Sequence, residues 1–185
     1  VVYARTGAGQ TVDQDSYENL TIAMGAAADT ASLETGTSTV NKDLKVTSGK
    51  LALVDAARTL NVTQNLTVGA AAGAVKATLE VGAGAMTVAG NTTSDNGNTQ
   101  GPLLTIGTGS LTAGAAGTFN FSTGSITFGG AGTLTLQGTV NAGALGTFTE
   151  GANSTVFYAR TGAGQTIDQD TYENLTIAMG AAADT

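Results

Sequence analysis

The chain repeats its own beginning. Residues 156–185 are a near copy of residues 1–30, displaced by 155 positions. Three positions differ, and each difference keeps the character of the side chain: Val2 against Phe157, Val12 against Ile167, and Ser16 against Thr171. Self-similarity at a fixed period is typical of repeat proteins. We therefore expect residues 1–155 to form one complete tandem-repeat unit and residues 156–185 to begin the next unit.

Within the unit, short apolar–polar–apolar triplets recur, such as Leu20-Thr21-Ile22, Leu66-Thr67-Val68 and Leu134-Thr135-Leu136. Three residues of alternating polarity predict a very short strand with two side chains inward and one outward. The outward residue is most often Thr, which suits a pleated surface. Gly, Ala, Asn, Asp and Ser separate the triplets and favour turns. No stretch shows a helical period.

The spacing of the triplets selects the architecture. In the second half of the unit, the expected strand starts fall near residues 104, 111, 119, 126, 134, 140, 148 and 156. Three such strands and three corners give roughly 22–24 residues per coil, and about seven coils per unit. Strand layers ~4.8 Å apart would raise each unit by about 33 Å. The sequence predicts an all-β parallel β-helix (β-solenoid) with short strands and no helices.

Composition argues against most catalytic chemistry. The chain contains neither His nor Cys, which excludes histidine-based triads and thiol nucleophiles and argues against zinc hydrolysis. We expect no catalytic residue, no cofactor and no enzyme. A β-helical enzyme that cleaves polysaccharides with paired carboxylates remains a weaker alternative.

Charge and hydropathy limit the partners. The net charge of −7 disfavours nucleic acid and anionic membrane surfaces. No apolar run approaches the ~18–20 residues of a membrane span. We expect neither a nucleic-acid partner nor a span.

The repeated segment also carries an acidic cluster. Asp13, Asp15 and Glu18 lie close enough in sequence to offer oxygen ligands to a hard cation. The cluster does not match the twelve-residue calcium loop, which needs a central glycine and a closing bidentate carboxylate. It is therefore a weak metal candidate, and a solvated acidic corner is favoured.

A second irregularity is the polar stretch of residues 90–101. It predicts a corner loop that projects from the coils, and a solvated insertion is favoured over a binding loop. Its candidate contact residues are Asn91, Asp95, Asn96 and Asn98. Thr-x-Thr pairs, such as Thr37 with Thr39 and Thr133 with Thr135, read as scattered rather than as the flat array an ice-binding surface would need.

Several segments resemble the repeats of very large bacterial surface proteins, the filamentous-haemagglutinin-like β-solenoid adhesins. The segments are Tyr17-Glu18-Asn19-Leu20-Thr21-Ile22, Thr39-Val40-Asn41-Lys42-Asp43-Leu44-Lys45-Val46, Gly49-Lys50-Leu51-Ala52-Leu53 and Asn65-Leu66-Thr67-Val68. The resemblance implies an exported protein with an adhesive, matrix or fibre role, at the cell surface or in a secreted filament.

These observations favour a structural role, an extracellular filament or stalk of tandem β-solenoid units. The expected partners are other copies of the repeat, joined covalently in tandem or head to tail. The alternative is an adhesin whose exposed Thr rows and 90–101 loop bind glycans or neighbouring filaments.

Overall fold

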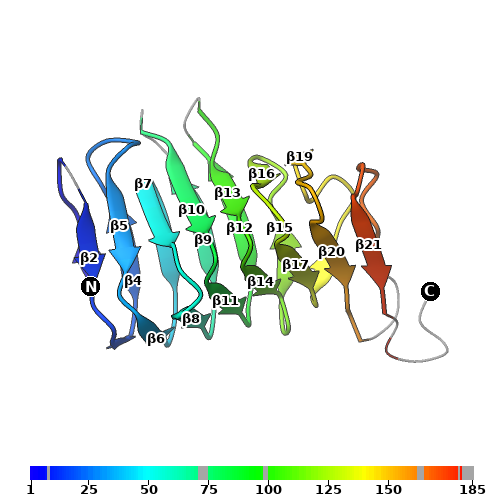
Figure 1. Ribbon diagram of the computed structural model, residues 1–185, viewed down its shortest axis with the longest axis horizontal. Coiled ribbons are helices and arrows are strands. Elements are labelled where there is room, and N and C mark those ends of the chain that lie inside the picture. Colours follow the sequence, from blue (N-terminus) through cyan, green and yellow to red (C-terminus); the bar gives the residue numbers. More distant parts are fainter. Residues whose placement is uncertain (8, 71–74, 98–99, 162–164, 179, 181–185) are drawn as a thin grey trace.

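The computed structural model describes residues 1–7, 9–70, 75–97, 100–161, 165–178 and 180. Within these ranges the chain forms strands and no helix, and the strands pair in parallel into a β-solenoid of about seven turns. Figure 1 shows the strands side by side along the long axis, with β2 (Gln10–Val12) near one end and β21 (Asn174–Ile177) near the other. The predicted fold class is confirmed.

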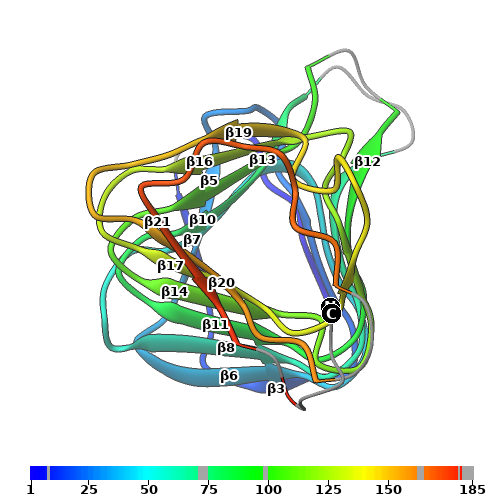
Figure 2. The same ribbon diagram turned by 90° about the vertical axis from the view of Figure 1, so that its right-hand side faces the viewer.

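Each coil contributes strands to three faces, which enclose a roughly triangular section in Figure 2. Face A contains β1 (Val2–Tyr3), β4 (Leu20–Ala23), the first half of β7 (Leu44–Leu53), β9 (Leu66–Ala70), β12 (Thr92–Asn96), β15 (Thr118–Asn120) and β18 (Thr139–Val140). Face B contains β2, β5 (Thr30–Leu33), the second half of β7, β10 (Ala77–Val81), β13 (Leu103–Ile106), β16 (Ser125–Phe128) and β19 (Thr147–Thr149).

Face C contains β3 (Ser16–Tyr17), β6 (Gly36–Val40), β8 (Arg58–Val62), β11 (Ala85–Val88), β14 (Ser110–Ala113), β17 (Thr133–Leu136), β20 (Thr155–Tyr158) and β21. The eight strands β13 to β20 each begin one residue before their predicted start, so the predicted spacing holds along the second half of the unit.

The triplets stack in register, and this stacking builds the core. On face B, Leu51, Leu79, Leu104 and Ile126 lie directly above one another and are fully buried. Burying each such side chain contributes about 1.5–3 kcal/mol relative to leaving it exposed. The apolar column is continuous from coil to coil, so each coil depends on its neighbours for its hydrophobic contacts.

Gly49 bends β7 from face A to face B and thereby joins the two faces into one thirteen-stranded sheet. Its φ of 69° lies in the left-handed region, which favours glycine. A Cβ at this position would also collide with the Met24 side chain of the preceding coil.

Candidate functional site

The repeated segment builds a small polar network inside the first coil. The Tyr3 and Tyr17 hydroxyls lie 3.2 Å apart, and the Tyr17 hydroxyl donates to the Asp13 carbonyl oxygen at 2.7 Å. The two rings meet edge to face, with centroids 6.4 Å apart. Burial, followed by the hydrogen bond with Tyr3, raises the pKa of Tyr17 above its ordinary value.

The second copy reproduces this network. The Tyr158 and Tyr172 hydroxyls lie 3.0 Å apart, and the Tyr172 hydroxyl donates to the Asp168 carbonyl oxygen at 2.9 Å. The strand register is also the same, because Val2 pairs with Thr21 and Phe157 pairs with Thr176. The described residues of the second copy therefore repeat the strand register and the tyrosine network of the first copy, although no strand there corresponds to β2 or β3.

The two copies occupy different faces. In the first copy, β1 and β4 pair on face A, whereas in the second copy the corresponding strands β20 and β21 pair on face C. From β1 to β18 the chain completes six coils, and it then adds β19 and β20. The 155-residue period is therefore not a whole number of coils, a property that the sequence analysis did not predict.

The two copies also differ in which side of the repeated segment is covered by another coil. Val1 is 64% exposed, whereas its counterpart Val156 is 2% exposed because it lies against Leu134. Asp168 is 8% exposed, and its carboxylate accepts hydrogen bonds from the backbone N–H of Gly143 at 2.6 Å and of Leu145 at 2.8 Å. Its counterpart Asp13 is exposed.

The opposite side of the segment is covered in the first copy and open in the second. Leu20 and Ile22 are fully buried beneath Leu44 and Val46. Their counterparts Leu175 and Ile177 are 41% and 50% exposed. The side of the segment that faces the preceding coil is therefore open in the first copy and covered in the second. The side that faces the following coil is covered in the first copy and open in the second.

The acidic cluster has its own contacts. Asp15 accepts a hydrogen bond from the backbone N–H of Ser16 at 2.7 Å. Glu18 forms an ion pair with Lys42 at 2.6 Å, and this contact raises the pKa of Lys42. Among the residues that the structure describes, no group of three or more carboxylates is arranged to hold a metal ion.

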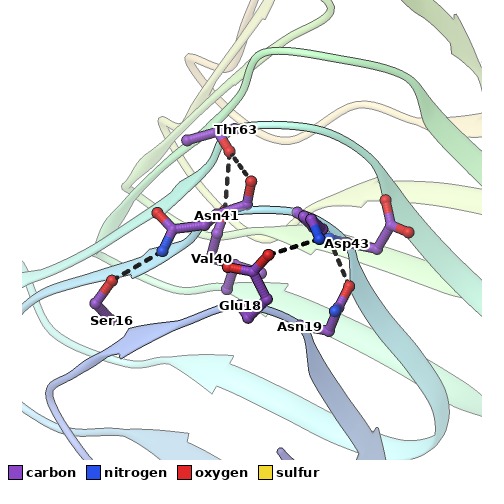
Figure 3. A network of polar contacts seen from close by, with 8 residues as sticks. Ser16, Glu18, Asn19, Val40, Asn41, Asp43 and Thr63 are labelled. Carbon is purple, nitrogen blue, oxygen red and sulfur yellow. Dashed lines mark hydrogen bonds and ion pairs between the residues drawn. The ribbon is translucent and has the colours of Figure 1, made fainter.

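An asparagine ladder at the corner between faces C and A was missed. Its members lie one coil apart, and each directly precedes a strand of face A: Asn19, Asp43, Asn65 and Asn91. The Asn19 side chain accepts from the Asp43 backbone N–H, as Figure 3 shows, and Asn65 bonds both Asp43 and Asn91. An Asn or Asp recurring at the coil spacing was the signal available in the sequence.

The candidate contact loop is shorter than predicted. Residues 92–96 form strand β12 on face A, and Thr92 points inward. Asn91 belongs to the ladder, Asp95 lies half-buried on β12, the side chain of Asn96 is not described, and Asn98 lies outside the described residues.

The Thr pairs that looked scattered in the sequence form two outward rows on face C. One row contains Thr37, Thr59, Ala85, Ser110, Thr133, Thr155 and Asn174, and the other contains Ser16, Thr39, Asn61, Thr87, Thr112, Thr135, Phe157 and Thr176. Neither row contains a charged residue, whereas face B carries the ion pair of Lys50 with Glu80 at 2.7 Å.

No helix in the described ranges is long and apolar enough to cross a membrane. Comparison of the chain with models of protein families, with curated proteins and with solved structures found no match.

Proposed function

We propose that the chain is part of an extracellular filament or stalk, built from tandem 155-residue units of one continuous β-solenoid, with a structural and non-catalytic role. The observation that carries this proposal is that the second copy of the repeated segment, in its described residues between 156 and 178, reproduces the strand register and the tyrosine network of the first copy. A second unit that begins by stacking on the first extends the same rod.

The physics of solenoids supports a mechanical role. Each coil buries its apolar side chains against its neighbours, so the stability of the rod grows with the number of coils. At ~4.8 Å per strand layer, six and two-thirds coils would add about 32 Å per unit. The resemblance to filamentous-haemagglutinin-like adhesins supports an extracellular location and a fibre or adhesive role.

A second candidate function, adhesion, is favoured by the two uncharged rows of face C. Hydroxyl and amide side chains at strand spacing offer a regular set of donors and acceptors. Such a face suits a neutral glycan or a neighbouring filament, because approach to it does not bring charges of the same sign together.

The test is a length series. Proteins of one, two and four units, each closed by residues 1–30, would be measured by small-angle scattering and electron microscopy. The proposal predicts rods of constant cross-section that lengthen by about 32 Å per added unit. Compact particles joined by flexible linkers would refute a continuous solenoid. Antibody labelling of intact host cells tests the extracellular location separately.

A further inference from the structure

We propose that consecutive units dock through the repeated segment with a rotation of one face, or one third of a turn, and that Asp13 receives the backbone of the preceding unit. This inference deepens the proposed tandem filament and rests on it. The partner surface is the corner at residues 141–146 of another copy of this unit.

The first step concerns the side that is open in the first copy. In the second copy, the Asp168 carboxylate accepts hydrogen bonds from the backbone N–H groups of Gly143 and Leu145, at the corner of residues 141–146. Around Asp13, the same tyrosine network holds the backbone in the same arrangement, but the carboxylate is exposed. Asp13 is thus positioned to accept hydrogen bonds from the same two N–H groups. Such bonds to an ionised carboxylate are charge-assisted and therefore strong.

The second step concerns the side that is open in the second copy. The first-copy counterpart of Gln169 is Gln14, whose backbone N–H donates to the Glu34 carboxylate of the following coil. The counterpart of Asp170 is Asp15, whose carbonyl oxygen accepts from the backbone N–H of Thr39. A following coil equivalent to residues 30–53 would therefore bond the backbone of Gln169 and Asp170 in the same way and would cover Leu175 and Ile177.

The third step gives the rotation. One period moves the segment from face A to face C, because 155 residues contain six coils and two further strands. Repeating the step moves it to face B, and only the third period returns it to face A. Each surface feature, including the two rows of face C, would then point to three sides of the filament in turn. A filament of this kind can contact neighbours or ligands on all sides rather than along one edge.

The first experiment uses the two copies as each other's control. Asp168→Ala in the 185-residue chain should reduce the hydrogen-exchange protection of the Gly143 and Leu145 amides by about tenfold or more, because each loses a carboxylate acceptor. Asp13→Ala should leave stability unchanged. In a chain extended by residues 120–155 placed before Val1, Asp13→Ala should then reduce the protection of the added corner as Asp168→Ala does. If Asp13→Ala leaves the hydrogen-exchange protection of the added corner unchanged in the extended chain, the docking role of Asp13 is wrong.

The second experiment is electron cryomicroscopy of the four-unit protein. The inference predicts a rotation near one third of a turn between successive copies of the segment. Straight rods whose units all present the segment on one face would overturn the rotation and leave the proposed filament intact. Particles that are not continuous rods would overturn the proposed function itself, so the two failures are distinguishable.

Discussion

At the scale of single residues, the alternation of inward and outward side chains has a polar exception. Thr92 points inward on β12, between Leu66 and Phe119 in the same row, and is fully buried. Its hydroxyl has no hydrogen-bond partner among the described residues. Burying an unpaired hydroxyl costs about 1–3 kcal/mol, so a substitution that removes this hydroxyl should stabilise the folded chain.

Thr92→Val should raise the free energy of unfolding by about 1 kcal/mol, because it keeps the side-chain shape and removes the unpaired hydroxyl. The measurement is urea unfolding of the variant and the parent. Thr93→Val is the matched control, since Thr93 faces outward and its hydroxyl lies 3.4 Å from that of Thr67. Destabilisation by Thr92→Val would mean that the hydroxyl has a partner in solution.

The buried tyrosine pairs predict a loss of stability at alkaline pH. Burial is the main cause that raises the pKa values of Tyr17, Tyr158 and Tyr172. Above the unfolded tyrosine pKa of about 10, the unfolded chain releases these protons while the folded chain keeps them, so the free energy of unfolding falls as pH rises. Urea midpoints between pH 9 and pH 11 (about one unit either side of that pKa) would measure the loss of stability.

The double variant Tyr17→Phe, Tyr172→Phe separates this effect from lysine titration. It should lose stability less steeply than the parent above pH ~10, because two of the perturbed hydroxyls are gone. Parallel curves for the two proteins would assign the alkaline loss to other groups.

At the scale of elements, the corners are as specific as the strands. Between faces B and C, successive coils approach closely through glycines: Gly109 lies over Gly84, and its N–H donates to the Gly82 carbonyl oxygen at 2.8 Å. A Cβ at Gly109 would overlap the Gly84 carbonyl oxygen, whereas the atom nearest to a Cβ at Gly129 would be 4.0 Å away.

Gly109→Ala should therefore lower the free energy of unfolding by about 1–3 kcal/mol, because the backbones of two coils must move apart. Gly129→Ala, at the same corner of the next coil, should change the free energy of unfolding by less than about 1 kcal/mol. Thermal or urea unfolding of both variants tests the difference. Equal effects would show that the coils can separate at this corner without loss of pairing.

The strands could be predicted because each short triplet carries its own signal. Alternation alone locates β13 and β17 to within one residue, since an inward Leu or Ile on either side of an outward Thr has one stable placement on a half-buried sheet. The sequence predicts a loop in place of strand β12, because Thr92, Thr93 and Ser94 show no alternation of polarity. Its pairing comes from β9 and β15 on either side, which is tertiary context that overrides local propensity.

The candidate site was predictable only in part, for a related reason. The repeat identified the segment, but the role of Asp168 depends on the corner at residues 141–146, which belongs to the preceding coil. The change of face depends on the summed length of all corners within the unit. Small errors in the predicted length of each corner accumulate over the unit. The triplet spacing therefore locates each strand but does not determine on which face the second copy of the segment begins.

At the scale of the whole molecule, the chain carries a net charge of −7 with few charged residues. Several of these charges are paired within the rod: Glu18 with Lys42, Glu80 with Lys50, and Asp55 with Arg58. Ion pairs at the surface contribute little to stability. The apolar column and the parallel ladders therefore account for most of the stability, and this has a consequence for divalent ions.

Removal of divalent cations should leave the rod folded. Treatment with excess chelator is expected to shift the Tm by less than about 2 °C, below the effect of a 1 kcal/mol change in a chain of this length. The reason is that Glu18 is paired with Lys42, and Asp15 bonds the backbone N–H of Ser16. The measurement is thermal unfolding followed by circular dichroism, with and without chelator, and again after calcium is restored.

Glu18→Gln provides the control for the chelation experiment, because it removes one carboxylate of the acidic cluster and its ion pair with Lys42 without touching the apolar column. Its Tm should also stay close to that of the parent, since an exposed ion pair stabilises weakly. A large fall in Tm with chelator that calcium reverses, and that Glu18→Gln reproduces, would contradict the prediction. Asp13, Asp15 and Glu18 would then act as ligands, because a cation that binds only the folded chain stabilises it by mass action.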